Sequence, residues 1–203
     1  LNSYENRVYQ IGMTQGQPII AKFYRPNRWS DDQIIEEHDF AFDLEDAELP
    51  VVAPVTDDEG CSLFWHEGFR FALYPRKGGH APELDNLDNL LILGRLLGRM
   101  HEVGSVCRFE HRPAIDVQSF GYDSVALISE QFMPDDLRPA YDGLAQDLLQ
   151  MLDEAMSIAS QANLSLLRVH GDCHVGNMLW RDDNPHFVDF DDARMAPAIQ
   201  DIW

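Results

Sequence analysis

The sequence is poor in cysteine and lacks any long apolar run. Its three cysteines, Cys61, Cys107 and Cys173, are odd in number and far apart, and none belongs to a Cys-x-x-Cys pair. This pattern argues against a disulfide framework and a cysteine zinc site, and it suits a reducing cytoplasm. The most apolar stretch, residues 90–97, contains a glycine and an arginine and is too short to span a bilayer. No signal-like segment opens the chain, so we expect a cytoplasmic protein.

Basic residues are also scarce. The chain has 15 Lys and Arg against 35 Asp and Glu, which gives a formal net charge of -20 at pH 7. No run of Lys or Arg offers a local basic patch, so the surface would repel a polyanion. Nucleic acid and membrane surfaces are therefore not expected as partners. The acidity is interpreted as a solvated surface that keeps the protein soluble.

Apolar residues are nevertheless sufficient for a core. They make up 45% of the 203 residues, which is an ordinary globular composition. The chain begins at Leu1 without a Met and stops at Trp203, directly after a segment that looks like a functional site. We therefore expect the chain to be a fragment.

The segment around which the chain is organised carries polar residues after two apolar runs. Residues 164–169 precede Asp172 and Asn177, and a second apolar run precedes Asp189. Phosphoryl transfer needs a group that accepts the proton of the attacking hydroxyl and oxygen ligands for a metal. Asp172 is predicted to be the catalytic base, whereas Asn177 and Asp189 are predicted to hold Mg²⁺. The spacing Asp-x-x-x-x-Asn matches the catalytic loop of protein kinases.

The first part of the chain predicts a nucleotide-binding sheet. Residues 7–11 and 18–24 read as a β-hairpin that contains Lys22, in the place of the strand Lys that contacts ATP phosphates in kinases. Residues 61–65 and 69–74 read as a second hairpin. In a kinase-like fold the end of this hairpin becomes the hinge, so backbone groups of Leu73 and Tyr74 are predicted to contact adenine.

A helix is predicted from Ser30, which can cap its first turn, to about Leu44. Glu37 falls on the apolar face of this helix, whereas Glu36 points about 100° away from it. A carboxylate on a packed face needs a partner. We therefore expect Glu37, and not Glu36, to pair with Lys22.

The second part of the chain predicts helices. Residues 85–101 carry an apolar stripe in which glycines would allow close helix packing, and His101 is expected to be a hydrogen-bonded core residue. Residues 109–139 appear irregular, and residues 141–159 predict a second long helix. The expected organisation is a β-rich N-lobe of residues 1–75 and a mainly helical C-lobe of residues 76–203.

Several motifs resemble a known family. His170-Gly171-Asp172 and the segment 188–192, Val-Asp-Phe-Asp-Asp, look like the aminoglycoside phosphotransferase and choline kinase group of the protein kinase-like superfamily. Within that group, four stretches resemble the bacterial stress response kinase A family. They are residues 1–9 (LNSYENRVY), 22–26 (KFYRP), 167–174 (LRVHGDCH) and 201–203 (DIW).

This resemblance implies an α+β, bilobal protein kinase-like fold that is truncated at both ends. It also implies ATP and Mg²⁺ as cofactors, a monomer, and a protein Ser/Thr hydroxyl as acceptor, including the protein's own. A role in bacterial stress response and a contact of Ser3 with phosphate are implied as well. Residues 3–6 lack the glycines that a protein kinase carries at this place.

Three alternatives remain open. The same residues suit a kinase of small hydroxyl compounds such as choline, homoserine or aminoglycosides. A metal-dependent hydrolase is a second alternative, because His170, Asp172, Cys173 and His174 are all possible metal ligands. A nucleotide-binding module without catalysis is the third.

Overall fold

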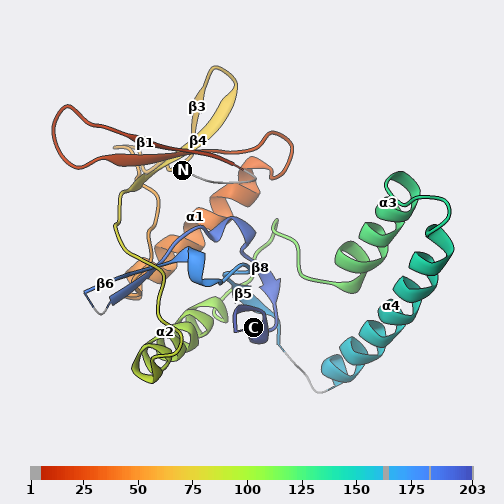
Figure 1. The fold of residues 1–203 in the computed structure, drawn as a ribbon. Coiled ribbons are helices and arrows are strands. Elements are labelled where there is room, and N and C mark those ends of the chain that lie inside the picture. Colours follow the sequence, from red (N-terminus) through yellow and green to blue (C-terminus); the bar gives the residue numbers. More distant parts are fainter. Residues whose placement is uncertain (1–5, 162–164, 183, 203) are drawn as a thin grey trace. The chain divides into compact units, whose positions relative to one another are not determined.

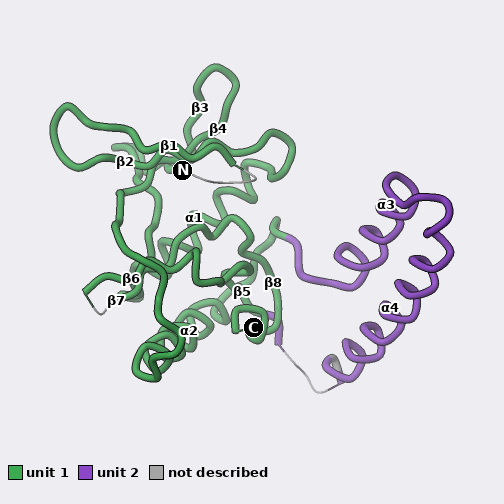
Figure 2. Tube along the Cα trace, in the orientation of Figure 1, with its two compact units in different colours: residues 1–112, 167–203 green, residues 113–166 purple. Residues whose placement is uncertain are grey.

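The computed structural model describes residues 6–161, 165–182 and 184–202. The chain forms two compact units, residues 1–112 with 167–203 and residues 113–166 (Figure 2). The division into lobes at residue 75 stays a prediction. Every predicted site residue belongs to the first unit.

The first unit begins with the predicted antiparallel sheet (Figure 1). Its strands are β1 (Arg7–Ile11), β2 (Ile19–Phe23), β3 (Phe64–His66) and β4 (Phe69–Pro75), in the order β1-β2-β4-β3. The β3–β4 turn consists of Glu67 and Gly68, with φ of 48° and 83°. Positive φ at both positions is typical of the type I′ turn, which matches the twist of a hairpin. Both predicted hairpins are confirmed.

Helix α1 (Asp31–Asp46) begins where the sequence predicts. The Ser30 side chain accepts a hydrogen bond from the Gln33 amide, and the Gln33 side chain accepts one from the Ser30 amide. This capping box satisfies amides that have no partner inside the helix. The helix buries one face, which includes Glu37: Ile34, Glu37, His38, Phe40, Ala41 and Leu44.

Helix α2 (Leu87–Gly104) confirms the second predicted helix, but its buried face differs from the predicted stripe. Leu93, Met100 and Gly104 are buried, whereas Leu87 is 74% exposed. A side chain added at Gly94 would meet nothing within 4 Å. The prediction of the packed face was wrong, because the close approach to the rest of the unit occurs at Gly104. An added Cβ there would lie 2.1 Å from the carbonyl oxygen of Arg168.

Short strands and turns complete the first unit. Strand β5 (Leu167–Val169) pairs with β8 (Arg194–Ala196), and β6 (Met178–Arg181) pairs with β7 (Asn184–Phe187). Three 3₁₀ turns lie between or after these strands: η2 (Val175–Asn177), η3 (Phe190–Asp192) and η4 (Ala198–Asp201). The loops that carry Asp172 and Asp189 therefore start and end on strands.

The second unit is helical. It contains η1 (Gln118–Tyr122), α3 (Asp123–Gln131) and α4 (Arg138–Gln161). Helix α4 confirms the predicted long helix. The expectation that residues 109–139 are irregular was wrong for α3, because this helix is stabilised by contacts with α4 that its own short pattern does not reveal. The Tyr122 hydroxyl donates to Asp153 at 2.6 Å, and the Ser129 hydroxyl donates to Asp142 at 2.7 Å.

None of the helices in the described part of the chain has the length and apolar character needed to cross a membrane.

Candidate active site

The loop between β5 and β6 carries Asp172. Gly171 precedes it with φ of 85°, and a Cβ added there would lie 2.1 Å from the carbonyl oxygen of Asp192. A glycine is therefore required both by the backbone conformation and by the close approach. The Asn177 amide nitrogen donates to the Asp172 carbonyl at 2.9 Å and to its carboxylate at 3.2 Å. Asp172 and Asn177 are thus brought together, with the Asp172 side chain half exposed.

A buried carboxylate holds the backbone of this loop. Asp201 accepts hydrogen bonds from the amides of His170 and Gly171 at 3.0 and 2.9 Å. His101 lies in helix α2, and its Nε2 is 3.0 Å from the same carboxylate, which confirms His101 as a hydrogen-bonded residue. The role of Asp201 was missed at the level of the sequence, because its partners are about 30 or more residues away.

The His170 ring connects the same loop to the strand before Asp189. Its Nε2 donates to the carbonyl of Val188 at 3.0 Å, and its Nδ1 accepts from the Asp172 amide at 3.4 Å. Both ring nitrogens are therefore engaged within the fold. The Val188 amide also donates to the Asn177 carbonyl at 3.0 Å. These bonds place the Asp172 loop beside Asp189.

Lys22 lies among three carboxylates. Its ammonium nitrogen is 3.0 Å from Asp189, 3.0 Å from Asp191 and 3.4 Å from Glu37. The predicted ion pair between Lys22 and Glu37 is therefore present. Asp191 was not predicted as a partner, because three aspartates stand within four residues and no local pattern shows which of them faces Lys22.

Burial and the neighbouring charges act in opposite directions on the pKa values of Lys22, Glu37 and Asp191. Burial lowers the pKa of Lys22, but Asp189, Glu37 and Asp191 raise it well above its usual value. Burial raises the pKa of Glu37, and Lys22 and Arg112 oppose this rise. Burial also raises the pKa of Asp191, but Lys22 and Arg28 outweigh it and hold this pKa at about 2. Lys22 is therefore charged at neutral pH.

Asp189 differs from Asp191 in its exposure. The Asp189 side chain is 47% exposed, whereas that of Asp191 is 6% exposed. Asp189 also adopts a left-handed conformation with φ of 63° and ψ of 65°, which is uncommon for a residue other than glycine. Because Asp191 is enclosed by cations, Asp189 is the carboxylate of this pair that can bind a ligand from solvent.

A cavity of about 520 Å³ adjoins these residues, which is within the usual size range of small-molecule sites. Lys22, Glu37, Tyr74, Asn177 and Asp189 line it. Leu73 is not part of the wall, and its carbonyl accepts from the Val55 amide at 2.7 Å. The wall instead continues past Tyr74 through Pro75, which ends β4, and the residues of the following loop, which are Arg76, Lys77, Gly78 and Gly79. Ser3 lies outside the described residues.

The donor set at the cavity suits Mg²⁺ with a nucleotide. Asn177 uses its amide nitrogen on Asp172, which leaves the amide oxygen as the atom that could bind a metal. Together with Asp189 this gives two protein oxygens, and Mg²⁺ usually combines so few with phosphate and water oxygens. Across the described residues, no three or more His, Cys, Asp and Glu side chains are grouped so as to hold a metal. The hydrolase alternative therefore gains no support.

Comparison with known proteins identifies relatives of the chain. Stress response kinase A of Shigella flexneri is 46% identical over 206 residues, which cover 100% of the chain and 60% of that protein. Serine/threonine protein kinase RdoA of Salmonella typhimurium is 43% identical over 204 residues, which again cover 100% of the chain and 60% of that protein. The chain thus spans 60% of the length of these relatives. The resemblance to the stress response kinase A family is confirmed.

A solved structure supports the fold. Amicoumacin kinase hAmiN in complex with AMP-PNP, Ca²⁺ and Ami has a TM-score of 0.76 and 24% identity, and the match covers 100% of this chain and 60% of the kinase. The predicted α+β kinase-like fold is confirmed. A model of the phosphotransferase enzyme family matches residues 1–203. The chain therefore belongs to the phosphotransferase enzyme family.

Proposed function

We propose that the protein is an ATP- and Mg²⁺-dependent kinase that phosphorylates Ser or Thr hydroxyls of proteins. The observation that carries this proposal is the position of Lys22 between Glu37 and Asp189, in one cavity with Asn177. A site with a buried ammonium beside two oxygens that could bind a metal is better suited to bind the phosphates of a nucleotide than to bind an apolar ligand.

The roles of the residues follow from their surroundings. Asp172 accepts the proton of the attacking hydroxyl, and the hydrogen bond from Asn177 at 3.2 Å orients its carboxylate. Asn177 and Asp189 hold Mg²⁺, which when bound neutralises charge on the phosphate oxygens. Lys22 positions phosphate oxygens, and Glu37 holds Lys22 in place. Tyr74 and the residues after it, and not Leu73, would meet the adenine.

The acceptor is the part of the proposal that the local geometry leaves open. The chemistry at Asp172 is the same for a protein hydroxyl and for a small alcohol. The name of the Salmonella relative, serine/threonine protein kinase RdoA, supports a protein acceptor. The name of the Shigella relative, stress response kinase A, supports a role in stress response. The amicoumacin kinase, with less identity, favours the second candidate, a kinase of small hydroxyl compounds. The cysteine pattern supports a cytoplasmic location, and we propose that the kinase acts as a monomer.

Incubation of the complete natural protein with γ-labelled ATP and Mg²⁺ tests the proposal. Label is expected on the protein itself or on a generic protein acceptor, as phosphoserine or phosphothreonine. Asp172→Asn should lower turnover by roughly 10²–10⁴-fold, as is typical when a general base is lost, while nucleotide binding persists. Unchanged turnover in this variant would exclude Asp172 as the base. Transfer only to choline, homoserine or an aminoglycoside would establish the second candidate.

A further inference from the structure

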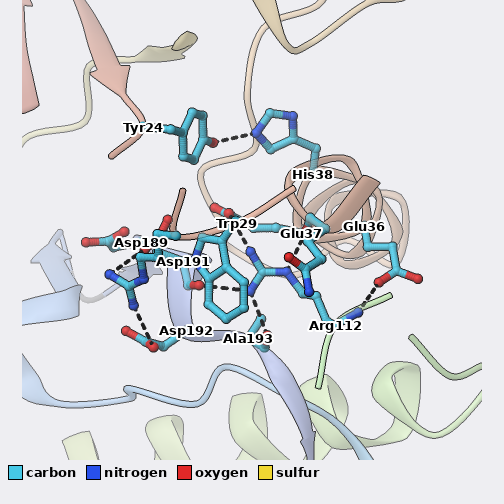
Figure 3. A network of polar contacts seen from close by, with 12 residues as sticks. Tyr24, Trp29, Glu36, Glu37, His38, Arg112, Asp189, Asp191, Asp192 and Ala193 are labelled. Atoms are coloured by element: carbon cyan, nitrogen blue, oxygen red, sulfur yellow. Dashed lines mark hydrogen bonds and ion pairs between the residues drawn. The ribbon is translucent and has the colours of Figure 1, made fainter. Parts of the chain in front are cut away.

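Arg112 is a buried arginine that contacts two parts of the candidate active site. Its side chain has 0% exposure, and its guanidinium lies 4.6 Å from the centre of the Trp29 ring. Figure 3 shows it between helix α1 and the segment after Asp189. No motif in the sequence marks this residue, which stands in a stretch that appears irregular.

The guanidinium binds both neighbours through hydrogen bonds. Toward helix α1, Nε donates to the carbonyl of Gln33 at 2.7 Å and Nη2 donates to Glu37 at 3.1 Å. Toward the other segment, Nη1 donates to the carbonyls of Asp191 and Ala193 at 2.8 and 2.7 Å. An arginine has five N–H donors in a rigid fork, so these contacts fix the distance between the two segments.

Helix α1 in turn holds the loop that carries Arg112. The carboxylate of Glu36 accepts from the amide of Arg112 at 2.7 Å and from that of His111 at 3.0 Å, and the Glu110 amide donates to it as well. The adjacent acids of the helix thus have separate tasks. Glu36 binds the loop backbone, and Glu37 binds the side chains of Arg112 and Lys22.

We infer that Arg112 is a positioning residue that holds Glu37, and through it Lys22, at a set distance from the turn that follows Asp189. The inference rests on the proposed function of Lys22 and Asp189. Glu37 is buried between two cations, so loss of one of them weakens its hold on the other. Of the two carbonyls that Arg112 binds, that of Asp191 lies inside the turn η3 that follows Asp189, and that of Ala193 comes directly after this turn.

The test compares Arg112→Lys with Arg168→Lys in the complete natural protein. Arg168 is a matched control, since it is equally buried, pairs with Asp43 of helix α1 at 2.8 Å, and lies 4.6 Å from the ring of Phe40. Its side chain contacts neither Glu37 nor residues 186–193 among the contacts of the described residues, whereas its backbone pairs with Met195 of β8. The comparison therefore uses residues 186–193 and leaves β8 out. Lysine keeps the charge in both variants but lacks the fork.

The first readout is amide hydrogen exchange of the nucleotide-free protein. Arg112→Lys is expected to speed exchange of residues 186–193 by about tenfold or more, because two charge-assisted hydrogen bonds to this segment are lost. Arg168→Lys should leave this segment unchanged. Unchanged exchange in Arg112→Lys, or an equal rise in both variants, overturns the inference. This result does not depend on activity.

The second readout is kinetic. Arg112→Lys should lower kcat/KM for ATP by about 10–100-fold and raise the Mg²⁺ concentration needed for half-maximal rate, because the phosphate and metal ligands are misplaced. Arg168→Lys, with a similar loss of melting temperature, should keep the wild-type Mg²⁺ requirement. A wild-type protein that transfers no phosphate overturns the proposed function, and the exchange result still decides the role of Arg112.

A milder variant covers the case in which Arg112→Lys does not fold. Glu36→Ala removes the acceptor of the loop amides without creating an unpaired buried charge. It should raise exchange of residues 186–193 in the same direction, to a smaller extent. Exchange at the wild-type rate in a folded Glu36→Ala protein counts against the inference.

Discussion

Asp189 and Asp191 are two residues apart, yet their surroundings assign them different tasks. Among the described residues, the half-exposed carboxylate of Asp189 has one cationic partner, Lys22. Asp191 is enclosed by Lys22 and Arg28, at 3.0 and 3.1 Å. The first arrangement leaves an oxygen that could bind a metal, whereas the second balances the charges of the buried Lys22 and the partly buried Arg28. A sequence in which three aspartates stand within four residues does not distinguish these tasks.

This difference predicts opposite effects for two asparagine variants. Asp189→Asn should abolish the Mg²⁺ dependence of binding of a non-hydrolysable ATP analogue and should change stability little. Asp191→Asn should keep that dependence but lower the free energy of unfolding by about 3 kcal/mol, because it removes one of the three carboxylates around the buried Lys22. Nucleotide titrations at several Mg²⁺ concentrations, together with urea unfolding, measure both effects. The reverse pattern would transfer the metal role to Asp191.

Helix α1 is attached to the sheet through His38. The ring lies between two hydroxyls, with Nε2 2.7 Å from Tyr24 and Nδ1 2.7 Å from Ser62. Burial lowers the pKa of His38 to about 3, and Lys22 and Arg112 contribute to the shift. The ring is therefore neutral in the folded protein. In the unfolded chain its pKa is about 6.5.

Because the pKa is lower in the folded state, the contribution of His38 to stability is complete above about pH 6.5 and decreases as the pH falls toward 3. Each pH unit in this window costs about 1.4 kcal/mol, so the loss between pH 7 and pH 5 is about 2 kcal/mol. Urea unfolding of the wild type and of His38→Gln at both values measures it. The variant should be less stable at pH 7 and less dependent on pH.

An exposed histidine provides the control for this experiment. His66→Gln, at the end of β3, should keep the wild-type pH dependence, since its side chain is exposed. If His38→Gln shows the same loss of stability from pH 7 to pH 5 as the wild type, another group is responsible for it.

The charge of the chain as a whole predicts an effect of salt. A formal net charge of -20 on 203 residues produces repulsion within the compact state. Salt at 0.1 M screens charges that are more than about 10 Å apart, whereas buried ion pairs such as Lys22–Asp191 are screened much less. An increase in NaCl from about 0.02 to about 0.2 M should therefore raise the melting temperature by about 2 to 5 °C.

Calorimetry at a series of NaCl concentrations measures this shift, and a non-binding buffer keeps ion binding constant. A melting temperature that falls with salt would mean that attraction between surface charges outweighs the net repulsion. A variant with several surface acids changed to Gln should show a smaller shift.

The sequence alone predicted those features that depend on contacts between residues close together in the chain. The capping box at Ser30 and the two hairpins are formed within a few residues of chain, so their patterns are visible in the sequence. The roles of Asp172 and Asn177 stay predictions, but their spacing has a local consequence that the structure shows, the hydrogen bond between them. The choice of Glu37 over Glu36 succeeded because one face of a helix is a local property.

The features that depended on the folded structure join residues that are far apart. Arg112 meets Asp191 and Ala193 across about 80 residues, and Asp201 meets His170 across 31. Helix α2 has an apolar stripe, but its partner β5 lies some 60 residues later and contacts the face around Gly104. Local periodicity identifies a helix and its apolar face, but it does not state which part of that face another segment will cover, because packing is decided by contacts between distant segments.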